Sequence, residues 1–336
     1  MRSIGVAAAV MAAGMLAGCH YRLSEYGLHH YIAGKLAAER RDYRAALAEL
    51  TRAVSIDPKF ASAYTTTGDI YRKQGKYEKA AAAYERACAL DAYAFRPHYN
   101  LGVTYQLLAQ SAASPQLFAD YIAKAVRVYL RAVTIRPHDF DANLNLSACY
   151  YQQGKYDLAE QYCKVSIALD PNNPYARSNL ALIYDAQDRP HDAIRAYRQS
   201  LERDAHQPSV LFQLGLTYMR VNRLRDALNA FELAARQDPR WPAPWVQIGT
   251  CRFYQKQYDA ALAAYTKAIE LDRNCDEGYR GLGVVYMTQY IQDPTKVALR
   301  DKALAAWNRS LELDPNQEDL RELVAKYTPR LTGPGL

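Results

Sequence analysis

The chain has 336 residues, of which 50% are hydrophobic and 23% charged, and its formal net charge is +7. These values, with only 16 Gly and 15 Pro, exclude a collagen-like or intrinsically disordered chain. The charge is modest for this length and is weak evidence for a nucleic acid or an anionic membrane as partner. Tyrosine is unusually frequent, with 28 Tyr against 7 Phe and 3 Trp. An ordinary core would use more Phe, so the tyrosines need an explanation.

The start of the chain has the pattern of an export signal. Arg2 supplies a positive charge, and the uncharged apolar stretch over residues 4–16 is too short for a membrane-spanning helix. It ends in Leu16-Ala17-Gly18-Cys19, which resembles the lipobox of bacterial lipoprotein precursors. The resemblance implies removal of residues 1–18 and lipidation of Cys19. Because the next residue is His20 rather than Asp, it also implies delivery to an outer membrane, facing the periplasm.

An ordinary signal peptide and an uncleaved apolar start are the alternatives. Residues 19–26 are predicted to form the lipidated N-terminus and a short tether, which anchors the protein without spanning the membrane. No later segment has about 18 uninterrupted apolar residues, so we expect no other span.

A period of 34 residues runs through the rest of the chain. Endings such as Ile56-Asp57-Pro58 and Leu90-Asp91 recur at this spacing. The period is that of the tetratricopeptide repeat, a helix–turn–helix unit, and the chain resembles eight such repeats. The resemblance implies an all-α, right-handed superhelix, or α-solenoid, and residues 318–336 are expected to form a capping helix and a tail. The predicted repeats are 27–60, 61–94, 95–139, 140–173, 174–207, 208–241, 242–275 and 276–317.

Each repeat has small residues where its two helices, A and B, must approach closely. Counting from the first residue of each repeat and omitting insertions, position 20 is Ala in all eight, and position 27 is Ala or Ser throughout. Position 8 is Gly, Ser or Ala, although glycine inside a helix costs about 1 kcal/mol in helix propensity. Large rings at positions 11, 17 and 24 are predicted to fill the gap that these small residues leave. Fourteen of the 28 tyrosines occupy those positions, so much of the tyrosine excess is architectural.

Two repeats are longer than the period. The third has 11 extra residues between Tyr105 and Ala125, and the eighth has 8 extra between Tyr286 and Ala303. We expect lengthened helices joined near residues 111–115 in the third repeat, and a break at residues 292–294 in the eighth. Such insertions project from one edge of a solenoid, where they either serve binding or reflect drift in an exposed loop.

Position 11 lacks its usual aromatic residue in two repeats. The first repeat has Ala37 there, and the seventh has Arg252, followed by Phe253 as a candidate replacement in packing. Either repeat is therefore a candidate for a marginally stable unit.

Nothing in the sequence indicates catalysis. It contains no Walker loop and no H-E-x-x-H, G-x-S-x-G or C-x-x-C motif. The repeats also leave too few residues for a separate catalytic domain, so we expect no enzyme, no cofactor and no metal site. Cys149 and Cys163 lie in one repeat, which makes a disulfide conceivable in an oxidising periplasm. Since Cys163 occupies core position 24, buried free thiols are the favoured interpretation.

Helix A of each repeat is expected to line an inner groove, and position 6 of that helix carries a side-chain amide in five consecutive repeats. Amides both donate and accept hydrogen bonds, so such a ladder can bind the backbone of an extended peptide. It resembles the asparagine ladder of O-linked N-acetylglucosamine transferases. Apolar residues beside it are predicted to form pockets for peptide side chains. The alternative is that Asn at position 6 is simply common in this repeat and that the residue at position 5 packs between repeats. The ladder is Asn100, Asn145, Asn179, Gln213 and Gln247, and the apolar residues are Tyr99, Leu144, Tyr151, Phe212, Met219, Val246 and Phe253.

These features predict a non-catalytic, membrane-anchored periplasmic scaffold or adaptor that binds a protein or peptide partner, in cell-envelope assembly, pilus or secretion, or cell-wall complexes. A self-associating structural solenoid is the alternative, and homo-oligomers fit either interpretation. If the signal is not processed, a cytosolic regulator is a weaker alternative. A nucleic acid is not expected, because no basic stripe is present and the presumed location is outside the cytoplasm. A small-molecule substrate is not expected either.

Overall fold

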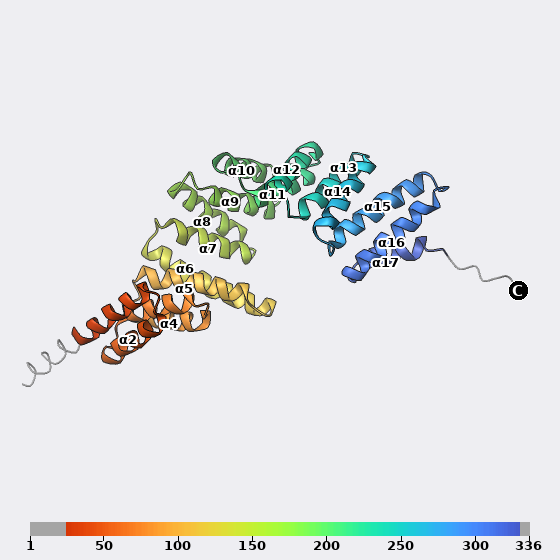
Figure 1. The fold of residues 1–336 in the computed structure, drawn as a ribbon. Helices are drawn as coiled ribbons and strands as arrows, with labels where there is room; N and C mark the ends of the chain where they lie inside the picture. The colour runs from red at the N-terminus through yellow and green to blue at the C-terminus, as the bar shows by residue number, and fades with distance from the viewer. Residues whose placement is uncertain (1–24, 330–336) are drawn as a thin grey trace, which may run out of the picture. The chain divides into compact units, whose positions relative to one another are not determined.

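The structure is a computed structural model that describes residues 25–329. The predicted signal segment, Cys19 and the tail after residue 329 lie outside the described residues. The described chain is an all-α solenoid of consecutive helical hairpins, which confirms the predicted fold class (Figure 1). It divides into two compact units, with residues up to 171 in the first and residues from 172 in the second. The first unit thus holds repeats one to four, and the second holds repeats five to eight with the final helix.

The first unit begins with a helix over residues 25–39, which packs on α2 through the approach of Gly34 to Leu50. These two helices form the first hairpin, and three further hairpins follow, each made of an A helix and a B helix in contact along their length. The labelled helices of this unit are α2 (Tyr43–Ile56), α3 (Ala61–Lys73), α4 (Tyr77–Leu90), α5 (Phe95–Gln110), α6 (Pro115–Ile135), α7 (Phe140–Gln152) and α8 (Tyr156–Leu169).

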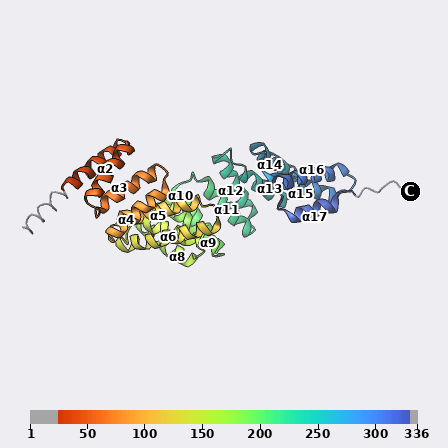
Figure 2. The same ribbon diagram turned by 90° about the horizontal axis from the view of Figure 1, so that it is seen from below.

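The second unit repeats the same pairing four times and adds α17, which buries Leu320 beside Trp307. Two views at right angles show the partners of its hairpins side by side, as in α15 and α16 (Figures 1 and 2). The helices are α9 (Pro174–Ala186), α10 (Pro190–Arg203), α11 (Pro208–Arg220), α12 (Leu224–Gln237), α13 (Ala243–Tyr254), α14 (Tyr258–Leu271), α15 (Asp276–Gln292), α16 (Val297–Leu313) and α17 (Glu318–Tyr327). The predicted capping helix is therefore present.

The turn between helices A and B takes a left-handed backbone at position 15 in six repeats. Glycine, which adopts this conformation without strain, provides it at Gly75 and Gly154, both with φ of 71°. Other residue types hold it in the first, fifth, sixth and seventh repeats, at Arg41, Asp188, Asn222 and Lys256. The two repeats with insertions use other connections, and their helices end and begin at the predicted places, Gln110 to Pro115 and Gln292 to Val297.

Helices A and B approach closely because the ring at position 24 lies on the bare backbone of position 8. In five repeats a Cβ atom built on the glycine at position 8 would come within 2.2–2.7 Å of that ring. The alanines at position 20 and the small residues at position 27 are all 0% exposed, so they complete the same contact. The glycine–ring pairs are Gly68–Tyr84, Gly102–Tyr129, Gly215–Phe231, Gly249–Tyr265 and Gly283–Trp307.

The fourth repeat fills the same space with two mid-sized residues. Ser147 stands at position 8 and Cys163 at position 24, and both are 0% exposed. The Ser147 hydroxyl donates to the carbonyl of Ala159 at 2.7 Å, which satisfies its polar group within the core. In this repeat the residue at position 8 is therefore larger than the usual glycine, and the residue at position 24 is smaller than the usual aromatic ring.

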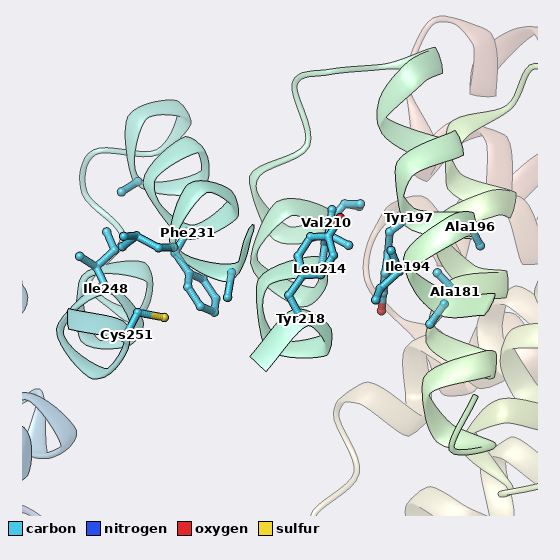
Figure 3. Close-up of a cluster of buried hydrophobic side chains, with 14 of the residues drawn as sticks. Ala181, Ile194, Ala196, Tyr197, Val210, Leu214, Tyr218, Phe231, Ile248 and Cys251 are labelled. Carbon is cyan, nitrogen blue, oxygen red and sulfur yellow. The ribbon is translucent and has the colours of Figure 1, made fainter. Parts of the chain in front are cut away.

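The same packing continues between neighbouring repeats of the second unit. Val210 and Leu214 of α11 lie beside Ile194 and Tyr197 of α10 in one buried cluster (Figure 3). On the other side of that cluster, Phe231 contacts α13 near Ile248 and Cys251. The core is therefore a chain of linked contacts, each shared by adjacent hairpins, rather than one central mass.

The cysteines of the described residues form no disulfide, so the conceivable bridge between Cys149 and Cys163 is absent from this structure. Both are 0% exposed, and burial raises the pKa of each thiol to about 12. A thiol that stays protonated near neutral pH is unreactive, so both act as small core residues.

We predict that Gly215→Ala lowers the free energy of unfolding by about 1–3 kcal/mol, because the new Cβ would lie 2.5 Å from the Phe231 ring. Chemical denaturation monitored by circular dichroism measures this change. The matched control is Gly215→Ser combined with Phe231→Cys, which copies the Ser147–Cys163 pair of the fourth repeat. The double variant should lose less stability than the two single changes together, and strict additivity would contradict the proposed contact.

Candidate peptide-binding site

The predicted amide ladder is engaged internally in the first unit. The side chain of Asn100 is 8% exposed, and its amide donates to Asp69 at 2.8 Å. The amide of Asn145 donates to the hydroxyl of Tyr99 at 3.3 Å. Asn100, predicted as a rung for a peptide backbone, therefore already donates to a residue of the preceding repeat.

Asp69 is the centre of a polar cluster that the sequence analysis missed. One of its carboxylate oxygens accepts from the hydroxyl of Tyr84 at 2.6 Å and from Asn100, and the other accepts from Arg96 at 2.6 Å. The only available sequence signal was an acidic residue at position 9, one step along the helix from the glycine at position 8. Burial raises the pKa of Tyr84 above its ordinary value, so this hydroxyl is a fixed donor. The cluster ties two repeats together and leaves few polar groups for a ligand.

The apolar groove residues of the first unit pack against neighbouring rings. Tyr99 stacks on Phe95, with 5.7 Å between ring centres. Tyr151 lies 5.7 Å from the ring of Tyr156. Leu144 is half-buried. These residues therefore form a partly filled wall rather than open pockets.

The second unit brings two predicted amides into one pocket. Asn179 on α9 and Gln213 on α11 line a cavity of about 470 Å³ between the two A helices. Neither side-chain amide has a hydrogen-bond partner among the described residues, so both present free donors and acceptors. Tyr175, Leu182, His206 and Val210 add mixed polar and apolar surface to the walls. This pocket is our candidate peptide-binding site.

The elements around the pocket are fixed by local caps. Asn173 accepts from the backbone amides of Tyr175 and Ala176 at 3.0 and 3.3 Å, which begins α9. At the other side, the buried Gln207 donates to the carbonyls of Asp204 at 2.6 Å and Ser200 at 3.3 Å. These bonds hold the loop before α11 in place, so the pocket is preformed.

A second polar cluster lies one helical turn beyond the pocket. Asp185 accepts from the Thr217 hydroxyl at 2.7 Å and pairs with Arg220 at 3.1 Å. Burial raises the pKa of Asp185, while its hydrogen bonds and Arg220 oppose that shift. Like Asp69, this carboxylate ties consecutive A helices together through polar contacts.

The remaining predicted residues of the second unit take different places. Val246 is only 6% exposed and belongs to the core, which differs from the expectation that it faces the groove. Phe212 packs between Phe231 and Trp241, at 5.5 and 4.8 Å between ring centres. The other three are half-buried, namely Met219, Gln247 and Phe253.

The chemistry of the pocket is that of recognition. Two amides can pair with a peptide backbone, while tyrosine, leucine and histidine offer contact surface for side chains.

Among residues 25–329, no group of His, Cys, Asp and Glu side chains is arranged to hold a metal ion. Over the same range, no helix is long and apolar enough to cross a membrane.

Two curated proteins illustrate how far similarity extends. The chain is 30% identical over 117 residues to the probable UDP-N-acetylglucosamine–peptide N-acetylglucosaminyltransferase SPINDLY of Hordeum vulgare, covering 34% of this chain and 12% of that protein. It is 21% identical over 148 residues to Superkiller protein 3 of Schizosaccharomyces pombe, covering 44% and 10%. The chain thus spans about a tenth of the length of these curated relatives.

Solved structures share the fold. The Cut9–Hcn1 hetero-tetramer of the APC/C aligns with a TM-score of 0.56 at 18% identity, covering 84% of this chain and 52% of the other. PilF of Pseudomonas aeruginosa aligns with a TM-score of 0.52 at 19% identity, covering 65% and 94%. At these identities the likeness concerns the fold alone.

Two family models match the sequence directly. The tetratricopeptide repeat model matches residues 242–275, which are the residues assigned to the seventh repeat. The model described as the cilia and flagella-associated protein 70 C-terminal domain matches residues 5–226. Tetratricopeptide repeats bind protein and peptide partners, and this chain is a protein–protein interaction scaffold of that kind. The chain belongs to the tetratricopeptide-repeat family described as the cilia and flagella-associated protein 70 C-terminal domain.

Proposed function

We propose that this chain is a non-catalytic scaffold that captures an extended segment of a protein partner in the pocket between α9 and α11. The observation that carries the proposal is the pair of free amides, Asn179 and Gln213, on neighbouring A helices of one preformed pocket. The amides at the same repeat position in the first unit, Asn100 and Asn145, already donate hydrogen bonds to other side chains of this chain. Capture therefore depends on the second unit.

We further propose that the scaffold is anchored to a membrane through a lipid on Cys19. The motivating feature is the lipobox-like Leu16-Ala17-Gly18-Cys19 after an uncharged apolar stretch. Five residues separate Cys19 from the first described helix, which starts at residue 25, six steps along the chain. Such a tether reaches about 20 Å at full extension, so the repeats would lie close to the membrane surface. The cell envelope, with the outer membrane facing the periplasm, is the proposed location, and complex assembly there is the proposed process.

A second candidate function, self-association, has its own supporting observation. The first helix exposes an apolar row spaced by four residues, in which Leu28, Ile32 and Leu36 are 47%, 49% and 49% exposed. Residues at this spacing share one helical face. The row lies at the beginning of the repeat array, where a second copy of the chain would extend or close it.

We expect Asn179→Ala with Gln213→Ala to reduce partner recovery at least tenfold, because two amide hydrogen bonds contribute about 1 kcal/mol each or more. Affinity purification from solubilised cell envelopes, quantified by mass spectrometry, measures the recovery. Asn308→Ala, which removes an exposed amide of α16, is the matched control. Unchanged recovery with the double variant would show that partners bind elsewhere.

The anchor is tested separately by Cys19→Ser. We expect this variant to lose palmitate labelling and to leave the membrane fraction, while Cys88→Ser, a half-buried cysteine of α4, retains both. If the Cys19→Ser protein and the natural protein are equally membrane-bound and equally unlabelled, the lipobox interpretation is wrong.

Self-association is tested by light scattering across protein concentration. If the apolar row mediates it, Ile32→Glu with Leu36→Glu should convert the oligomer to a monomer, since two charges would enter a desolvated interface. Leu158→Glu, at a 38% exposed position of α8, is the control and should leave the mass unchanged. A strict monomer for the natural chain at all concentrations would remove this candidate.

A further inference from the structure

Most repeats cover the outer side of helix A with an aromatic ring and a cation. The tyrosine at position 11 lies under a lysine from position 19 in the second, third and eighth repeats, with distances of 5.7–5.9 Å from the amine to the ring centre. An arginine from position 16 takes that place in the fifth and sixth repeats, at 4.2 and 4.7 Å. In the fourth, the ring of Tyr150 stacks on Tyr162 at 5.7 Å. The ring and its partner thus occupy the space between helices A and B on this side.

The seventh repeat lacks both members of that pair. It has Arg252 at position 11 and Ala260 at position 19. The Arg252 guanidinium reaches sideways, donating to Gln257 at 2.7 Å and pairing with Glu232 at 3.1 Å. No ring therefore covers α13 at this point, and a hollow takes its place.

This outer hollow has a volume of about 640 Å³ and lies between α12 and α14, with α13 as its floor. Trp245 and Ile248 form the floor, and small alanines form much of the walls. Ile248 is the α13 residue that Figure 3 shows near Phe231. The wall alanines are Ala235, Ala260, Ala263 and Ala264. The volume is in the range of sites that hold a bulky side chain or a small ligand.

The surroundings of the outer hollow are basic. Arg236, Arg252 and Lys267 line it together with one carboxylate, Glu232. A larger depression of about 840 Å³ shares Arg252 with it and adds Arg223, Arg225 and Asp226. Five cations line the joined surface, and three of them pair with carboxylates, as Arg223–Asp226, Arg252–Glu232 and Lys267–Glu270. Arg225 and Arg236 add positive charge beyond these pairs. An acidic partner segment complements that charge.

The indole of Trp245 supplies one more unsatisfied group. Its Nε1 atom is buried and has no hydrogen-bond acceptor among the described residues. A buried donor without an acceptor is unfavourable, and it favours an occupant that brings oxygen atoms to the floor of the hollow.

We propose that the outer hollow is a second binding site, which receives one bulky apolar side chain from an acidic segment of a partner protein. The apolar floor would accept the side chain, and the surrounding arginines and lysine would bind flanking Asp or Glu residues. The site is formed by α12, α13 and α14 alone, so it is independent of the pocket between α9 and α11. A scaffold with both sites can hold two segments at once.

The test uses the full-length protein and the fluorescein-labelled peptide Asp-Glu-Asp-Trp-Asp-Glu-Asp in a fluorescence anisotropy titration. We expect binding at least tenfold tighter than for the same peptide with Ala in place of Trp, or with Lys in place of the acidic residues. Equal binding of the Trp and Ala peptides, or no detectable binding of the acidic Trp peptide, would overturn the proposal.

The decisive variant is Arg252→Tyr with Ala260→Lys. It restores the ring–lysine pair of the second, third and eighth repeats, so it should fold, and it fills the hollow without changing the net charge. We expect at least a tenfold loss of affinity for the acidic Trp peptide, and unchanged affinity would refute the site. Asn308→Ala, an exposed position of α16 outside both sites, is the control, and its affinity for this peptide should equal that of the natural chain. A loss of affinity in Asn179→Ala with Gln213→Ala would instead place the peptide in the other pocket and contradict the outer site.

Discussion

The fold depends on one contact, the ring of position 24 lying on the bare backbone of position 8. It sets the distance between the two helices of a hairpin, and glycine occurs there despite its poor helix propensity because a Cβ would strike the ring. The contact also reaches the groove, since the tyrosine hydroxyls extend past the glycine. Tyr84 donates to Asp69 at 2.6 Å, and Tyr129 donates to Gln106 at 2.6 Å. The ring that closes a hairpin therefore also orders polar groups on its inner face.

That coupling decides which amides remain free for a partner. Asn100 is bound because position 9 of the preceding repeat is Asp69, whose carboxylate accepts its amide. Gln213 meets no such acceptor, since position 9 of its preceding repeat is Leu182, which lines the same pocket. The side chain at position 9, next to the residue at position 8, thus decides whether the amide of the following repeat forms a structural hydrogen bond or stays free to bind a partner. Binding capacity along a repeat array is set by pairs of neighbouring residues, not by the amide alone.

Local rules made most of the fold predictable from sequence. Three features depend on close neighbours along the chain, and the structure has them as expected. They are the small residues at positions 8, 20 and 27, the ends of both insertions, and the capping helix. The engagement of Asn100 was not predictable in that way, because it depends on Asp69, 31 residues earlier in another repeat. Val246 was misplaced for a similar reason, since its burial comes from packing with Ala261 and Tyr265. Nor does the repeat pattern change at residue 171, where the two compact units divide.

Two departures from the repeat pattern keep the core filled when one residue is larger and its neighbour is smaller, and they leave a hollow when both reduce the volume. In the fourth repeat, Ser147 is larger than glycine and Cys163 is smaller than tyrosine, so the core stays filled. In the seventh, Arg252 and Ala260 remove the outer ring and its covering cation together, and neighbouring alanines do not refill the space. Protein interiors and interfaces are close-packed, so an uncompensated loss of volume leaves apolar surface that another molecule can cover. Comparing a chain's repeats with one another therefore separates residues that maintain the fold from residues available for recognition.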